Sequence, residues 1–143
     1  MHALSLSRLV YFSRNLVSIQ SDGASAELND ILAASAVNNS RQSITGALLY
    51  DENWFLQVLE GDRGAVSATF LRIASDKRHA EVTLCEVSSQ SSRLFAQWSM
   101  AAGWVPSDSL IYRNHGYGER FDPSILDGQQ AVLLAMDLVT RRK

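Results

Sequence analysis

Apolar and polar positions follow two different spacings along this chain, which predicts a fold with both helices and strands. Short stretches of alternating or continuous apolar residues are typical of strands, and apolar residues three and four positions apart indicate a helix. Leu28, Ile31 and Leu32 have the helical spacing. The predicted strands span residues 4–13, 44–50, 54–59, 80–88 and 95–105, and the predicted helices span residues 24–37 and 63–76.

The order of these elements, β-α-β-β-α-β-β, predicts an α+β fold of the ferredoxin-like type. Such a fold has a mixed five-stranded sheet with two helices on one face. The polar stretch at 14–23 is expected to be a loop, because it contains a Ser-Asp-Gly breaker. Asn38, Asn39 and Ser40 are expected to end the first helix, because short polar side chains favour helix ends.

The last part of the chain is predicted to be helical and to cover the other face of the sheet. Asp122 and Pro123 form a favourable helix start, with a capping side chain followed by proline. Between residues 131 and 139 only Asp137 is polar, so this helix is apolar nearly all round and must bury more than one side. We expect it to pack on the sheet and to meet a partner as well.

Length and composition favour a globular chain with a proper core. It has 143 residues, of which 46% are hydrophobic and 20% charged. We expect a main domain at 1–105 and a C-terminal helical cap or interaction segment at 106–143. The net charge of −2 gives no reason to expect nucleic acid as a partner. The basic run at 141–143 is expected to be a solvated helix end.

The sequence also indicates where the protein works. There is no charged start followed by a long apolar stretch, and the longest apolar run is too short to cross a bilayer. The single cysteine, Cys85, suits a reducing compartment and is expected to be a buried small hydrophobe. We therefore expect a cytoplasmic protein with no direct membrane contact.

Signatures of enzymes are missing from the sequence. No glycine-rich phosphate loop follows a strand, and the histidines at 2, 79 and 115 lack the spacing of metal ligands, so no metal is expected. Glu60 and Asp62 flank a glycine and are expected to mark a turn, not a catalytic pair. The chain is therefore not expected to be an enzyme.

Several local strings point to a known family. They include Tyr11-x-Ser13 and Ser35-x-x-Asn38-Asn39, followed by ITGALLY at 44–50, FLQVLEG at 55–61, DKRH at 76–79 and RLFAQWSM at 93–100. In this order they resemble the BLUF family, sensors of blue light that use FAD, over about residues 5–105. The resemblance implies the ferredoxin-like fold described above, with a flavin between the helices at 24–37 and 63–76.

The resemblance implies a set of residues that hold the flavin. Ile31 matches a position that packs on the ring, and Asn39 matches the asparagine that hydrogen-bonds the polar edge of the flavin. An amide suits that edge because it offers both a donor and an acceptor. Asn38 matches a neighbouring contact, with a helix-end pair as the alternative. Arg78 and His79 match a motif at the ring edge or ribityl-phosphate side, with a solvated basic turn as the alternative.

The resemblance also implies a switch. Tyr11 matches the photoactive tyrosine, and Gln57 matches the glutamine between that phenol and the flavin, which rotates or tautomerises after light. Trp98 and Met100 match residues of the last strand that exchange places near the flavin in some members. Either could contact Gln57 and carry the signal, with ordinary core as the alternative, and their side chains are expected on one strand face. Ser35, like Ser13, is expected to hold Gln57 or Tyr11 in place.

The chain departs from the family pattern at two places. The loop at 15–23 is longer than expected and is predicted near the flavin tail, and Ala36 stands where a basic residue is expected. FAD is the expected cofactor, with FMN or riboflavin as alternatives. We expect a short light sensor that forms a homo-oligomer and signals to another protein. A small flavin redox enzyme and a flavin-free interaction module are the competing functions.

Overall fold

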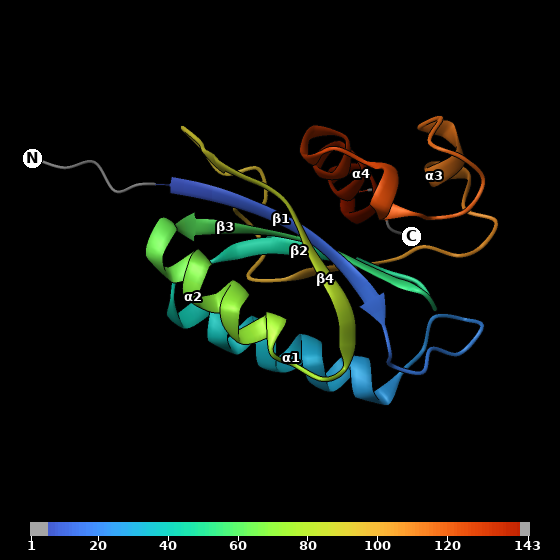
Figure 1. Ribbon diagram of the computed structural model, residues 1–143, viewed down its shortest axis with the longest axis horizontal. Coiled ribbons are helices and arrows are strands. Elements are labelled where there is room, and N and C mark those ends of the chain that lie inside the picture. Colours follow the sequence, from blue (N-terminus) through green and yellow to red (C-terminus); the bar gives the residue numbers. More distant parts are fainter. Residues whose placement is uncertain (1–5, 141–143) are drawn as a thin grey trace, which may run out of the picture.

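The computed structural model describes residues 6–140, which form one mixed sheet with helices on both faces (Figure 1). The basic run at 141–143 and the first two residues of the first predicted strand lie outside these residues. The strands are β1 (Leu6–Asn15), β2 (Thr45–Tyr50), β3 (Trp54–Asp62), β4 (His79–Ser89) and β5 (Ala101–Trp104). The helices are α1 (Ala26–Arg41), α2 (Arg63–Ala74), α3 (Leu110–Asn114), the short 3-10 helix η1 (Pro123–Ile125) and α4 (Gly128–Thr140).

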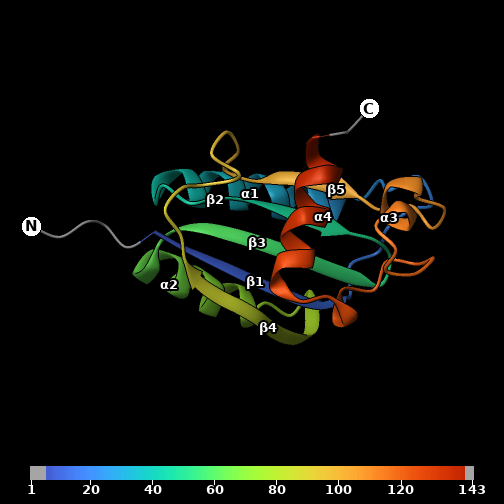
Figure 2. The same ribbon diagram turned by 90° about the horizontal axis from the view of Figure 1, so that it is seen from above.

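The sheet has the strand order β4-β1-β3-β2-β5. Three neighbouring pairs are antiparallel, and only β2 and β5 run parallel. Helices α1 and α2 cover one face, while α3 and α4 lie on the other (Figure 1). Seen from above, α4 lies across the strands (Figure 2). The predicted ferredoxin-like α+β fold, with the C-terminal helices on the second face, is confirmed.

Both long helices of the first face begin at a capping side chain. The hydroxyl of Ser25 accepts a hydrogen bond from the backbone N–H of Leu28, at the start of α1. The carboxylate of Asp62 accepts from the N–H groups of Gly64 and Ala65, at the start of α2. These bonds satisfy N–H groups that have no partner within the helix.

Helix α1 is longer than predicted. It continues through Asn38 and Asn39 to Arg41, and Gln42 forms its C-cap. The prediction that the two asparagines end the helix was therefore wrong. The side chain of Asn39 donates to the backbone carbonyl of Ser99, so it does not compete for the hydrogen bonds of its own helix.

The predicted strand at 95–105 is the largest error. Only residues Ala101–Trp104 pair as a strand, and residues 95–100 have irregular structure. The backbone groups that a strand would need are used elsewhere. The N–H of Phe95 bonds the carboxylate of Glu60, and the carbonyl of Phe95 closes a turn by accepting from the N–H of Trp98.

The tail also begins differently from the prediction. Asp122 caps η1, not the long tail helix, by accepting from the N–H of Ser124. Helix α4 begins at Gly128, where the carboxylate of Asp127 accepts from the N–H of Gln130. The apolar face of α4 then joins Val10, Leu49 and Val58 of the sheet in one buried cluster. Among residues 6–140 no helix is long and apolar enough to span a membrane.

Candidate functional site

Tyr11 and Gln57 form a buried polar pair at the centre of the sheet. They are direct partners in the register of β1 and β3, and both side chains point to the face covered by α1 and α2. The Tyr11 hydroxyl donates to Gln57 Oε1 at 2.5 Å. Burial, with a smaller contribution from the charge of Asp76, raises the pKa of Tyr11 well above its usual range. The phenol therefore stays protonated and acts as a donor to the amide.

The other end of the Gln57 amide faces a sulfur atom. Gln57 Nε2 donates to Met100 Sδ at 3.4 Å. Met100 packs against the apolar clusters on the α1 and α2 face. Trp98 instead packs against the cluster on the α4 face, with its ring centroid 6.5 Å from that of Phe95. The expectation that Trp98 and Met100 share a strand face was wrong, because the chain between them is not a strand.

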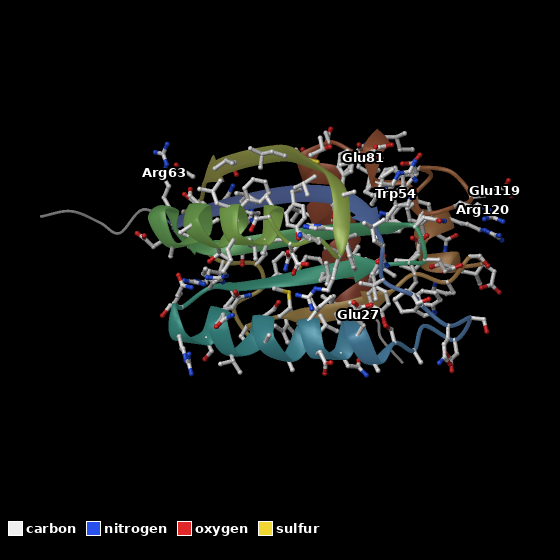
Figure 3. The ribbon with its side chains drawn as sticks, turned by 60° about the horizontal axis from the view of Figure 1, so that its bottom comes forward. Glu27, Trp54, Arg63, Glu81, Glu119 and Arg120 are labelled. Carbon is white, nitrogen blue, oxygen red and sulfur yellow. The ribbon has the colours of Figure 1, made fainter. Side chains whose placement is uncertain are left out.

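A cavity of about 230 Å³ lies in front of this pair. Figure 3 looks onto this face, where Glu27 and Arg63 mark the first turns of α1 and α2 at opposite ends. Eight of the predicted site residues line the cavity. They are Tyr11, Ile31, Ser35, Asn38, Asn39, Gln57, Arg78 and His79. The remaining lining residues are Ala34, Leu48, Phe55, Thr69, Arg72, Ile73 and Asp76.

The α1 wall of the cavity combines aliphatic and amide groups. Ile31 is half-buried and also packs with the core beneath it. Asn39 is buried, and its amide ties α1 to the backbone carbonyl of Ser99 at 3.0 Å. Asn38 and Ser35 are half-buried one helical turn apart. Such a wall suits a flat ring with a polar edge, because amides can donate and accept.

The opposite wall contains His79, whose two ring nitrogens are both used by the protein. Nδ1 lies 2.7 Å from the Ser13 hydroxyl, and Nε2 lies 2.7 Å from the carbonyl oxygen of Ile73. Ser13 therefore contacts His79, and not Tyr11 or Gln57 as expected. His79 contributes its ring to the cavity wall beside Tyr11, with ring centroids 6.2 Å apart.

Arg78 lies on the exposed rim of the cavity. Its Nε donates to Asp76 Oδ1 at 2.9 Å, and this hydrogen bond is the main reason that the pKa of Asp76 falls to about 2. The pair therefore keeps both charges at neutral pH. The loop at 15–23 contributes nothing to the cavity lining, and its Gly23 packs instead under Trp104.

Thr69 on α2 was missed by the sequence analysis. It is buried in the cavity wall, and its hydroxyl has no hydrogen-bond partner among the described residues. A buried hydroxyl without a partner costs stability, and a ligand with polar atoms would supply one. No sequence string pointed to Thr69, since threonine on a helix is ordinarily a surface residue. The orphaned hydroxyl, the aliphatic walls and the amides together fit a polar-edged aromatic cofactor such as a flavin.

Two helices thus line a cavity that ends on a phenol–amide pair, an arrangement that suits a cofactor-binding domain. The family described as "BLUF: Sensors of blue-light using FAD" matches residues 6–101. The chain belongs to the BLUF family. It is a blue-light-sensing flavoprotein domain, as the sequence strings predicted.

Solved structures agree with this assignment. BlsA in its photo-activated state has a TM-score of 0.80 and 26% identity, covering 96% of this chain and 97% of that one. The dark-state structure of BlrB, a BLUF protein, has a TM-score of 0.74 and 31% identity, with the same two coverages. Both likenesses extend beyond residue 101, so they include the C-terminal segment.

Curated relatives match only part of the chain. Photoactivated adenylate cyclase subunit beta of Euglena gracilis is 35% identical over 77 residues, which is 53% of this chain and 9% of that protein. The subunit alpha of the same organism is 36% identical over 69 residues, or 7% of its length. The chain thus spans less than a tenth of these relatives, and their cyclase activity belongs to those proteins.

Proposed function

We propose that this protein is a light switch in which Tyr11 and Gln57 rearrange their hydrogen bonds around a bound flavin. The short contact from the Tyr11 hydroxyl to Gln57 Oε1 carries the proposal, because it joins a proton donor to a group that can relay the proton. Asn39, Asn38, Thr69 and Ile31 would hold the ring, with Arg78 at the exposed end.

When bound, a flavin excited by blue light supplies an oxidant strong enough to take an electron from a nearby phenol. An oxidised phenol is strongly acidic, so Tyr11 releases its proton to Gln57 Oε1. The Gln57 amide then rotates or tautomerises, and rotation takes its donor end away from Met100 Sδ. Return of the electron and the proton to Tyr11 closes the cycle, so nothing is consumed.

The rearranged amide has a different set of partners in the dark and lit states. Gln57 Nε2 lies 3.4 Å from Met100 Sδ in this structure, which we propose is the dark arrangement, and a rotated amide presents its oxygen there instead. A thioether sulfur accepts hydrogen bonds but cannot donate one to that oxygen. Met100 therefore gains or loses a contact with each switch, which provides the differential interaction that a two-state signal requires.

The C-terminal segment at 106–143 is the proposed output element. Residues of α4 share a buried cluster with Trp98 and with the strand residues behind Gln57. The residues from Trp98 to Met100 therefore contact Gln57 at one end and, at the other, the buried cluster that includes α4. We propose that the lit state alters how α4 meets another protein chain, either a second copy or a separate partner. In this proposal the chain acts as a sensor, with FAD as the cofactor and FMN or riboflavin as alternatives.

The test is the substitution Gln57→Leu in flavin-loaded protein. Leucine removes the amide at nearly constant volume, so the variant should bind flavin and lose the light-induced red shift of its absorption. Gln129→Leu, on the exposed side of α4, is the matched control and should keep the shift. A Gln57→Leu protein with an unchanged reversible shift would overturn the proposal. A yellow wild-type protein with no shift would favour redox chemistry instead.

A further inference from the structure

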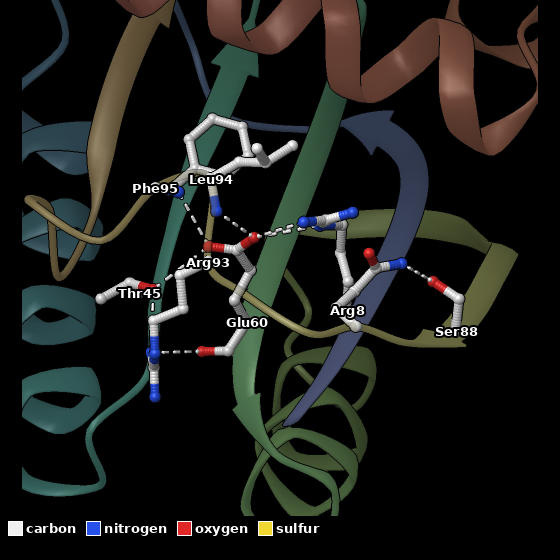
Figure 4. Close-up of polar contacts among 8 residues, drawn as sticks. Arg8, Thr45, Glu60, Ser88, Arg93, Leu94 and Phe95 are labelled. Carbon is white, nitrogen blue, oxygen red and sulfur yellow. Dashed lines mark hydrogen bonds and ion pairs between the residues drawn. The ribbon is translucent and has the colours of Figure 1, made fainter. Parts of the chain in front are cut away.

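A buried carboxylate lies on β3 three residues beyond Gln57. Glu60 is only 1% exposed, and it points to the face of the sheet opposite Gln57 because side chains alternate along a strand. Its two oxygens accept four hydrogen bonds and form one further ion-pair contact, through Arg8 Nη2 (Figure 4). The contacting groups are Nε and Nη2 of Arg8 at 3.0 Å each, the N–H groups of Leu94 and Phe95 at 2.9 Å each, and Oγ1 of Thr45 at 3.3 Å.

This arrangement corrects the sequence analysis, which placed Glu60 in a turn. The carboxylate is part of β3 and is paired with Arg8 on β1 and Thr45 on β2 in the sheet register. Arg8 is itself buried, so the pair sits in a medium of low polarity where an unmet charge is costly. The full set of donors keeps the buried Glu60 carboxylate satisfied.

Residues 93–100 form a crossover segment that leads from the β4 edge of the sheet to β5. Its first residue, Arg93, donates through Nη1 to Thr45 Oγ1 at 2.9 Å and to the backbone carbonyl of Glu60 at 3.1 Å. Its last residue, Met100, accepts from Gln57. Hydrogen bonds therefore join both ends of the segment to β3, one at the backbone of Glu60 and the other at the side chain of Gln57.

The middle of the crossover segment is also fixed. The carbonyl of Trp98 accepts from the N–H of Gly46 at 3.1 Å, and the carbonyl of Ser99 accepts from the side chain of Asn39. Between these bonds the chain turns, so that Trp98 packs toward α4 and Met100 toward Gln57. The crossover segment is therefore held at its start by Glu60 and in its middle by Gly46 and Asn39.

We propose that Glu60 is a positioning residue for Met100: by holding the N–H groups of Leu94 and Phe95, it fixes the crossover segment with Met100 against Gln57 and Trp98 against α4. The inference deepens the proposed light switch and rests on it. It assigns Glu60 no contact with the flavin, since Glu60 lies on the other face of the sheet. Its effect on the photocycle passes through Met100.

The substitution Glu60→Gln separates this role from simple packing. A glutamine has the same shape but offers only one acceptor oxygen. If its nitrogen takes the place of Oε2, the N–H of Leu94 and the Arg8 guanidinium lose their acceptor. If the nitrogen takes the place of Oε1, the N–H of Phe95 loses its acceptor. In either orientation one attachment of the crossover segment is lost.

The experiment measures the ¹³C-labelled Met100 methyl resonance in the dark and the rate of dark recovery. Glu60→Gln should move or split the Met100 resonance and slow recovery by about fivefold, since one hydrogen bond is worth about 1 kcal/mol. Glu81→Gln removes the same charge from an exposed position on β4 and should change neither readout. The double variant Glu60→Gln/Met100→Leu should recover no more slowly than Met100→Leu alone.

Three results would overturn the proposal. One is an unchanged Met100 resonance in folded Glu60→Gln protein, and another is an unchanged rate of recovery. The third is additive slowing in the double variant, which indicates a structural role independent of Met100. If Glu60→Gln fails to fold, Arg93→Gln loosens the same end of the segment and must show the same changes in weaker form. The Met100 resonance is measured in the dark and needs no light response. A protein without any light response would therefore refute the proposed function, and the dark resonance would still test whether Glu60 positions Met100.

Discussion

Tyr11 and Gln57 occupy directly opposite positions on β1 and β3, and the phenol donates to the amide oxygen at 2.5 Å. Their register, not a loop, therefore brings the two groups together. An antiparallel pair of central strands is among the most rigid parts of a fold, because both strands are hydrogen-bonded on two sides. The proposed switch thus rests on a fixed phenol and leaves the amide as the group that rearranges.

Met100→Leu tests the contact on the other side of the amide. Leucine has a similar volume but removes the sulfur that accepts from Gln57 Nε2. The dark arrangement loses a hydrogen bond, so dark recovery should slow by up to about fivefold. The matched control is Met136→Leu, because Met136 is a residue of α4 and packs on the other face of the sheet. Recovery kinetics after a blue-light pulse give the answer, and equal rates for wild type and Met100→Leu would contradict the account.

Thr69→Val tests whether the orphaned hydroxyl belongs to the cofactor site. Valine has the same shape and removes a buried polar group that lacks a partner. Flavin-free protein should therefore become slightly more stable, while the Kd for flavin should rise by about fivefold. Thr83→Val, at an exposed position of β4, should alter neither. Fluorescence titration with FAD measures the affinity, and an unchanged Kd for Thr69→Val would remove this residue from the site.

The sequence predicted the fold and the central residues for a physical reason. Periodicity and breakers identify elements, and the strings around Tyr11 and Gln57 lie on central strands whose register follows from their apolar patterns. Eight predicted residues consequently surround one cavity. The family and the fold class are both confirmed, whereas the individual roles of those residues stay predictions.

Polar contacts between residues far apart in the chain could not be predicted from the sequence. Residues 95–100 carry apolar positions that suit a strand, but Phe95 gives its N–H to the distant Glu60 and its carbonyl to a turn closed by Trp98. Trp98 and Met100 therefore face opposite sides of the sheet. Thr69 was missed because its significance is an absent partner, which only a packed structure reveals.

Asp51 should make stability depend on pH. Burial raises its pKa from the usual 3.8 to about 6, although N–H groups of Asn53 and Trp54 partly offset the shift. Between these two values the folded state holds a proton that the unfolded chain has lost, so stability falls as pH rises through this window. Asp51→Asn keeps the acceptor oxygen without the charge.

Urea unfolding at about pH 4 and about pH 7.5 measures this effect. The stability of Asp51→Asn relative to wild type should be greater at the higher pH. Asp108→Asn, at an exposed position, should give no such difference between the two conditions. A constant difference between Asp51→Asn and wild type would show that the Asp51 charge is not a source of instability.

The packing of α4 on the sheet is tested by two neighbouring leucines. Leu134 is 0% exposed, whereas Leu133, at the preceding position of the helix, is 52% exposed. Leu134→Ala should lower the free energy of unfolding by about 2–5 kcal/mol, because a cavity replaces a buried side chain. Leu133→Ala should change it by about 0.5 kcal/mol or less. Similar losses for both variants in urea unfolding would contradict the observed packing of α4.

The most direct test of the account is the absorption of flavin-loaded protein before blue light, immediately after it, and after a period in the dark. Wild type should shift slightly to the red and return, and Tyr11→Phe should bind flavin without any shift. Tyr50→Phe is the matched control and should behave as wild type. It removes a hydroxyl on β2 that donates to the carbonyl of Gly23 and does not line the cavity. A reversible shift that persists in Tyr11→Phe would contradict the central claim that the Tyr11–Gln57 pair is the switch.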